Sequence, residues 1–220
     1  MGNDLCILHV TIPGHCGQLE GQLLYRSEEA AGTGLIICPP HPLLAGNLEN
    51  NVVQAVAKTM VASMPVLLFN YPAVGKSTST RPDLPLFEYW NDLDQRNDYG
   101  MITEEVKKVL GWSAGYFQRF HLVGYSFGAC MALAAITSQA LSFTAIAPPL
   151  AACDFAALQT LAIPICLITA ENDNLLAAPT LRPRQEKITH TVITGADHFF
   201  LKREEQIAEQ IAGFIGAIVC

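Results

Sequence analysis

The sequence predicts an α/β fold, in which one mostly parallel sheet opens with an antiparallel hairpin and carries helices on both faces. Short apolar runs alternate along the chain with longer segments of helical periodicity, as is typical of parallel strands joined by helices. The runs are apolar throughout, as expected of strands that are covered on both faces. Of the 220 residues, 50% are hydrophobic, which suffices for one large core. We therefore expect residues 1–220 to form a single domain.

The hairpin is expected at the start of the chain. Residues 5–12 and 17–25 are both strand-like, and Pro13-Gly14 between them favours a turn. The later strands are expected at six apolar runs, which are residues 34–38, 66–69, 120–124, 143–147, 163–169 and 189–193. Helices are expected between and after them, at residues 47–62, 100–111, 127–138, 154–161 and 202–219. Pro179 and Pro183 interrupt the remaining candidate helix, near residues 177–185.

One long segment, at about residues 70–97, shows no regular pattern. It is rich in Pro, Ser, Thr and Asp, and Phe87, Tyr89 and Trp90 are embedded in it. A structureless loop of that length is unusual inside a compact domain and is often functional. We expect this loop to border the active site.

Composition excludes several classes of partner and location. The net charge is −7 and no block of Lys and Arg stands out, which argues against binding to nucleic acid or to an anionic membrane surface. No apolar run reaches the roughly 18 residues of a membrane span. The N-terminus lacks the basic and apolar regions of a signal peptide, so we expect a cytoplasmic protein. The seven cysteines form no C-x-x-C pair and lie mostly in apolar segments, which predicts buried, reduced thiols.

The strongest chemical signal is the sequence Gly124-Tyr125-Ser126-Phe127-Gly128. This G-x-S-x-G pentapeptide is weak evidence alone, but here an apolar strand leads into it and a helix rich in small residues follows. That context predicts the nucleophile elbow of an α/β-hydrolase, with Ser126 on a strained turn at the carboxyl edge of the sheet. The N–H of Phe127 would then face the negative charge that develops on an attacked carbonyl. The alternative is a glycine-rich turn in which Ser126 only caps the helix.

A serine hydroxyl needs a base to remove its proton, and in this fold class the chain order is Ser, then Asp or Glu, then His. Only His190 and His198 follow Ser126. His190 falls within an expected strand, where a side chain with a structural hydrogen bond is the simpler interpretation. His198 follows that strand and precedes the last helix, so we favour His198 as the base.

The acid that orients this base has three candidates. The strand at residues 163–169 leads into a polar turn that contains Glu171 and Asp173, both at the carboxyl end of the strand. Asp197 is adjacent to His198, but sequence neighbours rarely direct a carboxylate at each other's Nδ1. We favour Asp173, although Asp and Asn are common in turns for structural reasons alone.

The oxyanion hole requires a second N–H, from the loop after the third strand. That loop, residues 38–47, contains prolines at positions 39, 40 and 42, which have no N–H. Leu43 carries the first free amide beyond His41 and is our candidate for the second donor. We expect His41 to fix the loop by hydrogen bonding rather than to act directly in catalysis.

Two other motifs are rejected. Val74-Gly75-Lys76-Ser77 resembles the end of a phosphate-binding loop, but position 70 is Asn rather than Gly and no helix is expected after Ser77. The histidines are scattered, and His41 and His198 lack the spacing of metal ligands. We expect no metal and no cofactor.

With these segments in place, the chain resembles a family of small, lidless α/β-hydrolases related to the dienelactone hydrolases, from about residue 34 to the C-terminus. The segments that carry the resemblance are Cys38-Pro39-Pro40-His41-Pro42 with Gly46-Asn47, the serine elbow, Asp173, and Gly195-Ala196-Asp197-His198-Phe199-Phe200. The resemblance implies a triad of Ser126, Asp173 and His198, in agreement with the order along the chain.

This chain departs from the family in two places. The nucleophile of the dienelactone hydrolases is a cysteine, whereas this chain has Ser126. The family tends to carry Arg-Gly after the fourth strand, where residues 71–75 read Tyr-Pro-Ala-Val-Gly, and the following segment with Trp90 is atypical. Because these positions border the expected site, the resemblance does not define the substrate.

The sequence therefore predicts a serine hydrolase that cleaves a small-molecule carboxylic ester or thioester through an acyl-enzyme. Phe127, Leu44, Phe199 and Trp90 are candidates for an apolar acyl pocket, and each is equally a candidate for the core. The length leaves no room for a separate cap domain, which favours an open site. Two alternatives stay open: an amidase, peptidase or acyl transferase with the same residues, and a non-catalytic binding protein on this fold.

Overall fold

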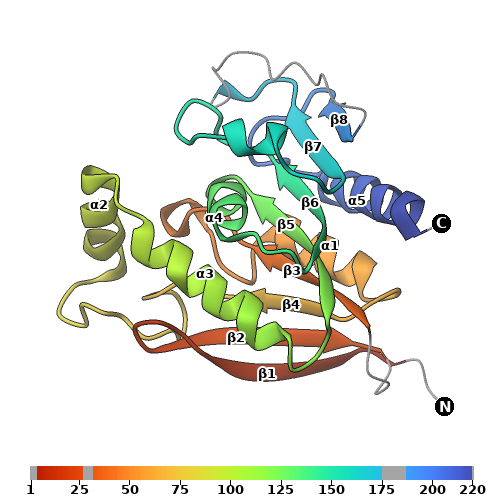
Figure 1. Cartoon of the computed structure of the whole chain (residues 1–220). Coiled ribbons are helices and arrows are strands. Elements are labelled where there is room, and N and C mark those ends of the chain that lie inside the picture. The colour runs from red at the N-terminus through yellow and green to blue at the C-terminus, as the bar shows by residue number, and fades with distance from the viewer. Residues whose placement is uncertain (1–3, 27–31, 175–186, 220) are drawn as a thin grey trace.

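The computed structural model describes residues 4–26, 32–174 and 187–219, which form an eight-stranded sheet in the order β1-β2-β4-β3-β5-β6-β7-β8 (Figure 1). β1 and β2 form an antiparallel hairpin, β2 pairs antiparallel with β4, and the strands from β4 to β8 are parallel. This is the predicted α/β-hydrolase fold. The strands are β1 Cys6–Pro13, β2 Gln18–Tyr25, β3 Thr33–Cys38, β4 Val66–Phe69, β5 Arg119–Tyr125, β6 Ala140–Ile146, β7 Ile165–Ala170 and β8 Ile188–Ile193.

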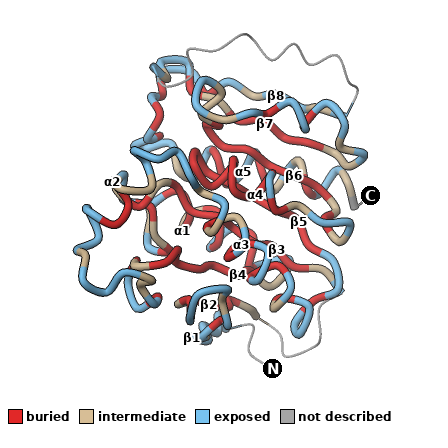
Figure 2. The backbone as a smooth tube through the Cα atoms, turned by 60° about the vertical axis from the view of Figure 1, so that its left-hand side comes forward, coloured by how far each residue is buried: buried red, intermediate tan, exposed pale blue. Residues whose placement is uncertain are grey.

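Helices cover both faces of the sheet, as predicted. α3 and α4 pack on one face and contribute to one buried core cluster, whereas α1 and α5 pack on the other face and contribute to a second. Figure 2 shows the buried backbone running through the central strands between these layers. The helices are α1 Asn51–Met60, α2 Leu86–Arg96, α3 Gly100–Ser113, α4 Phe127–Ala135 and α5 Glu204–Val219, with 3-10 turns η1 Pro42–Leu44 and η2 Ala156–Gln159.

The strand order reverses between β3 and β5. β3 pairs with β4 on one side and with β5 on the other, so the connections that leave β3 and β5 run in opposite directions. Their last residues, Cys38 and Gly124, are partners in register. In open α/β sheets, ligands bind outside the carboxyl ends of the strands at such a switch point. The fold therefore brings the loop after β3 beside the serine elbow.

Two predictions of secondary structure were wrong. The supposed loop at residues 70–97 contains the helix α2, Leu86–Arg96, which begins after Pro85. Proline is tolerated at the start of a helix, and α2 buries Tyr89 and Trp90 beneath a polar outer face. The helix expected at residues 154–161 is only the 3-10 turn η2. The uncertain segment near residues 177–185 lies outside the described residues.

The predicted state of the cysteines also needs correction. Cys130, in the first turns of α4, forms a disulfide with Cys153, which follows β6. Cys6 and Cys16 are exposed, and only Cys38 and Cys166 are buried free thiols; Cys220 lies outside the described residues. Neighbouring parallel strands bring the disulfide partners together although 23 residues separate them in sequence. No helix of the described residues is long and apolar enough to span a membrane, and a cytoplasmic location stays a prediction.

A buried carboxylate attaches α3 to the hairpin turn. Glu105 is 1% exposed and accepts hydrogen bonds from the backbone N–H groups of His15, at 2.6 Å, and Cys16, at 2.9 Å. Hydrogen bonds to a charged acceptor are stronger than neutral ones, and a buried donor that loses its acceptor is costly. Glu105 therefore holds the edge hairpin on the α3 face.

We expect Glu105→Gln to lower the free energy of unfolding by about 1–3 kcal/mol, because the amide retains one acceptor and turns its NH₂ group toward the other N–H. Urea denaturation at pH 7 measures the change. Glu104→Gln is the matched control, since Glu104 is exposed and its ion pair with Lys107, at 2.7 Å, is of the surface kind that contributes little to stability. Equal stability of the Glu105→Gln and wild-type proteins would contradict this account.

A histidine is buried inside the sheet core. The Nδ1 atom of His121, on β5, lies 2.8 Å from Oγ of Ser142 on β6, and its Nε2 has no hydrogen-bond partner among the described residues. Burial lowers the pKa of His121 to about 4. Since an unfolded histidine titrates near 6.5, the unfolded chain takes up a proton between pH 6.5 and pH 4 that the folded chain does not.

We therefore expect stability to fall as the pH drops through this window, with His121 contributing a loss on the order of 1–2 kcal/mol between pH 7 and pH 5. Replacing His121 by Leu removes that contribution and flattens the pH dependence by the same amount. Urea midpoints at pH 5, 6 and 7 measure it, and His9→Gln, in the exposed edge strand, is the control. An unchanged slope in His121→Leu would refute the assignment.

Candidate active site

Ser126 occupies a strained turn between β5 and α4. Its backbone has φ 52° and ψ −118°, a region that residues with a Cβ rarely adopt. A Cβ at Gly124 would collide with the backbone of Ala129, and one at Gly128 would collide with the carbonyl oxygen of Cys38. The two glycines therefore permit the close approach of helix, strand and loop that the elbow requires. The turn directs Ser126 to the carboxyl edge of the sheet, where the motif placed it.

The predicted base and acid lie in line with this serine. Oγ of Ser126 is 2.9 Å from Nε2 of His198, and Nδ1 of His198 is 2.7 Å from Oδ2 of Asp173. A carboxylate only accepts, so Nδ1 carries the proton and the lone pair of Nε2 faces the serine hydroxyl. The Tyr125 hydroxyl donates to the carbonyl of His198 at 2.8 Å and fixes the loop that presents the imidazole.

Both partners are shielded from water. The side chain of Asp173 is 0% exposed and that of His198 is 7% exposed. The attraction between two opposite charges grows as the dielectric constant around them falls. A carboxylate 2.7 Å from the imidazole in a site shielded from water is therefore well placed to stabilise an imidazolium. The arrangement is suited to a histidine that gains a proton during a reaction and then returns it.

The alternative candidates have other partners. His190, on β8, bonds through Nε2 to Oγ1 of Thr169 at 2.8 Å. Glu171 accepts from the N–H of Gly195 at 2.8 Å, and Asp197 accepts from the N–H of Phe199 at 3.0 Å. These three side chains support the strand edge and the loop after β8. The structure brings Asp173 and His198, and not these residues, to Ser126.

The two candidate oxyanion donors differ in their surroundings. Phe127 is the first residue of α4, and its N–H donates to none of the described residues, so it is free to bind a ligand oxygen. The N–H of Leu43 lies 3.3 Å from Nδ1 of His41, which caps η1. The expected role of His41 in fixing the loop agrees with this contact. Leu43 stays a prediction as an oxyanion donor.

Aromatic side chains fill the space behind the elbow. The ring of Phe127 lies 4.9–5.9 Å, centroid to centroid, from the rings of His41, Tyr71, Trp90 and Tyr99. Phe127 and Trp90 are 6% and 0% exposed, so both belong to the core rather than to an open acyl pocket. The other two candidates for that pocket, Leu44 and Phe199, are 44% and 50% exposed and are accessible to a substrate.

Sequence reasoning missed two residues beside this cluster. Oδ1 of Asp94 lies 3.0 Å from Nε2 of His41 and accepts a hydrogen bond from the Tyr99 hydroxyl at 2.8 Å. Asp94 lies in the last turns of α2, inside the segment that the sequence predicted to be irregular. The helical spacing of Tyr89, Trp90 and Leu93 was the available signal for α2, because it predicts a helix with one buried face.

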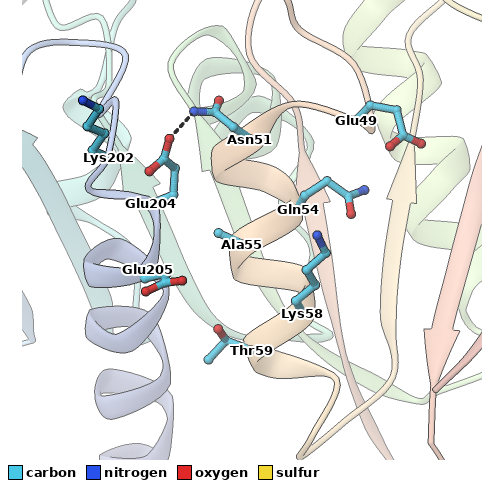
Figure 3. Close-up of a pocket in the computed structure, with 9 residues that line it drawn as sticks. All are labelled: Glu49, Asn51, Gln54, Ala55, Lys58, Thr59, Lys202, Glu204 and Glu205. Atoms are coloured by element: carbon cyan, nitrogen blue, oxygen red, sulfur yellow. Dashed lines mark hydrogen bonds between the residues drawn. The ribbon is translucent and has the colours of Figure 1, made fainter. Parts of the chain in front are cut away.

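A pocket elsewhere on the molecule contains none of these residues. Figure 3 shows it between α1 and α5, lined by mixed charged and polar side chains that include Glu49, Lys58, Lys202 and Glu204, with Asn51 bonded to Glu204. Across the described residues, no three His, Cys, Asp or Glu side chains are grouped so as to hold a metal ion.

Known proteins with similar sequences or structures share the fold of this chain. The chain is 27% identical over 214 residues to an uncharacterized protein of Rickettsia prowazekii, covering 90% of this chain and 84% of the relative. An α/β serine hydrolase homologue from Coxiella burnetii is 24% identical, with a TM-score of 0.70 over 96% of both chains. A lidless α/β serine hydrolase from Xanthomonas campestris is 20% identical, with a TM-score of 0.75 over 96% of this chain and 94% of the other.

The fold extends to the dienelactone hydrolases themselves. The dienelactone hydrolase from Anabaena variabilis is 17% identical, with a TM-score of 0.71 over 97% of this chain and 98% of the other. The sequence model of the dienelactone hydrolase family matches residues 86–213, which is more than half of the chain and includes the elbow, Asp173 and His198. The chain therefore belongs to the dienelactone hydrolase family and is a hydrolase of the α/β-hydrolase fold.

Proposed function

We propose that the protein is a serine hydrolase that cleaves a carboxylic ester or thioester through an acyl-enzyme, with Ser126, His198 and Asp173 as its catalytic triad. The observation that carries the proposal is the unbroken series of hydrogen bonds from Oγ of Ser126 through both ring nitrogens of His198 to Asp173. The strained elbow and the dry carboxylate support it, because both are features that a structural serine cap does not need.

In the first half-reaction, Nε2 of His198 takes the proton of Ser126 as Oγ attacks the acyl carbon. The Asp173 carboxylate stabilises the imidazolium that forms. The N–H of Phe127 donates to the oxyanion, and we propose Leu43 as the second donor. The imidazolium then returns its proton to the leaving alkoxide or thiolate as the acyl–heteroatom bond breaks. Water, deprotonated by His198, hydrolyses the acyl-enzyme in the second half-reaction and regenerates the Ser126 hydroxyl.

The proposed substrate class follows from what the site offers. The proposed nucleophile is a serine, whereas that of the dienelactone hydrolases is a cysteine. We therefore do not assign the substrate of the dienelactone hydrolases to this chain. The exposed side chains of Leu44 and Phe199 provide apolar contact area for an acyl or leaving group. An activated ester tests this proposal without requiring the natural substrate.

We expect Ser126→Ala and His198→Ala each to lower kcat/KM for p-nitrophenyl acetate by about 10³-fold or more, because the nucleophile and its base act as a unit. Initial rates and labelling of the protein by a fluorophosphonate probe measure the loss. His190→Gln is the matched control, since His190 bonds only to Thr169 in the described structure and should retain activity. An inactive wild-type protein that the probe does not label would favour a binding function instead.

We expect Asp173→Asn to lower kcat by about 10²–10⁴-fold with little change in KM. The amide can present an N–H to Nδ1 of His198, which then carries no proton and leaves Nε2 in the wrong tautomer to accept from Ser126. Steady-state kinetics with the same ester measure kcat and KM separately. Glu171→Gln, at the end of the same strand, is the control and should stay within about threefold of wild type. Equal losses in the two variants would argue against Asp173 as the orienting acid.

A further inference from the structure

His41 is the residue around which the loop after β3 is organised. Its carbonyl oxygen accepts from the N–H groups of Leu44, at 2.8 Å, and Gly46, at 3.0 Å. Its side chain accepts from the N–H of Leu43. The same imidazole packs edge-on against Phe127, with ring centroids 5.1 Å apart. One residue therefore connects the backbone of the loop to the first residue of the nucleophile helix.

A carboxylate from a different element holds this imidazole. Oδ1 of Asp94, near the end of α2, contacts Nε2 of His41 at 3.0 Å and the Tyr99 hydroxyl at 2.8 Å. A carboxylate accepts and does not donate, so Nε2 of His41 carries the proton and Nδ1 keeps its lone pair. Only this tautomer can accept the N–H of Leu43. The side chain of His41 is 13% exposed and that of Asp94 is 36% exposed.

The protonation state of His41 agrees with that tautomer. Burial lowers the pKa of His41, and the Asp94 carboxylate only partly opposes the shift. The imidazole is therefore neutral at pH 7, where it has one N–H for Asp94 and one lone pair for Leu43. A neutral imidazole without Asp94 would be free to place its proton on Nδ1, which would face the Leu43 N–H as a second donor.

We propose that Asp94 is a positioning residue for the reaction at Ser126, which acts through His41 to set the orientation of the Leu43 amide. The inference rests on the proposed function, because the Leu43 N–H matters to catalysis only if an oxyanion forms beside Phe127. Asp94 itself touches neither Ser126 nor His198 in any recorded contact, so its effect is transmitted through one imidazole and one backbone amide.

The Leu43 N–H has two possible acceptors, Nδ1 of His41 at rest and the oxyanion during the reaction, and they differ in strength. The contact between Leu43 N and His41 Nδ1 is 3.3 Å long, longer than the 2.8 and 3.0 Å bonds that the His41 carbonyl accepts, and its acceptor is neutral. An oxyanion is a charged acceptor and forms a roughly twofold stronger hydrogen bond. The resting bond keeps the peptide ordered, and the oxyanion can then take over the N–H without refolding the loop. Such preorganisation is the main source of oxyanion stabilisation.

The test compares two substitutions of Asp94 that differ only in whether an acceptor remains. Asp94→Leu removes the acceptor. We expect kcat for p-nitrophenyl acetate to fall about 5- to 30-fold and KM to stay within twofold of wild type. The fall in kcat is smaller than the roughly 10²–10³-fold loss that follows removal of an entire oxyanion donor, because the Leu43 N–H is still present. Asp94→Asn keeps an oxygen at the Oδ1 position for both His41 and Tyr99, and should retain at least a third of kcat. Asp92→Leu is the matched control, because Asp92 lies on the same helix and, within the described part of the chain, forms an ion pair only with Arg96, at 2.9 Å.

A double-mutant cycle separates positioning from simple loss of structure. His41→Asn places an amide oxygen two residues before Leu43, where asparagine commonly caps a turn, but this oxygen is on a shorter side chain than the imidazole that contacts Asp94. In the His41→Asn background, Asp94→Leu should change kcat by less than twofold, because the connection through the imidazole is already absent. Rates are expressed per site labelled by a fluorophosphonate probe, so misfolded protein does not count.

The outcomes distinguish this inference from the proposed function. Wild-type protein that neither hydrolyses the ester nor labels would refute the proposed function itself. An active wild type with Asp94→Leu at the same kcat, or above it, would refute only the positioning role. So would equal losses from Asp94→Leu in both backgrounds, or a fall in the labelled fraction with kcat per labelled site unchanged.

Discussion

The structure depends on the steric constraint at the turn between β5 and α4. Ser126 has a positive φ, and the glycines on either side of it allow α4 and the loop after β3 to approach the strand within van der Waals distance. A side chain at Gly128 would separate the nucleophile helix from the carbonyls of Cys38 and Pro39. The register of β3 with β5 then places the ends of these strands side by side. His198 and Asp173 form their hydrogen-bonded series with the serine that this turn presents.

The parallel strands supply the remaining partners in a fixed order. β5, β6, β7 and β8 are neighbours, so the loops at their carboxyl ends lie along one edge of the sheet. Asp173 follows β7 and His198 follows β8, and both reach back to a serine that follows β5. This explains why residues 47 and 72 positions beyond Ser126 form one short hydrogen-bonded series.

Much of the fold and of the proposed triad could be predicted from sequence because the signals are local. Apolar runs such as Val66–Phe69 define buried strands, and the glycine pattern around Ser126 defines a turn whose geometry few sequences permit. Chain order admits Glu171 and Asp197 as well as Asp173. Asp197 was disfavoured as a sequence neighbour of His198, and the family resemblance supported Asp173. The hydrogen bonds of the two rejected acids to Gly195 and Phe199 show what those residues do instead.

The parts that could not be predicted depend on packing between distant segments. α2 was missed because its polar composition and flanking prolines resemble a loop, and only its contact with η1 and the aromatic core stabilises Tyr89 and Trp90 as a buried face. The Cys130–Cys153 disulfide and the pairing of Asp94 with His41 have no local signal, since their partners are 23 and 53 residues apart. Turn and strand patterns are determined by residues close in sequence, whereas these contacts are determined by how distant segments pack in the tertiary fold.

Three other nonlocal hydrogen bonds hold the segments around the elbow and have a consequence for the proposed reaction. The Tyr125 hydroxyl fixes the carbonyl of His198, the Trp90 indole N–H donates to the carbonyl of Pro72 at 3.2 Å, and the Tyr71 hydroxyl donates to the carbonyl of Pro39 at 3.2 Å. Each bond attaches one segment near the elbow to a buried aromatic side chain. A site whose loops are already held in this way has little conformational entropy left to lose when a transition state forms. For the proposed reaction, the core around these described segments would therefore supply ordering that other enzymes obtain by closing a lid.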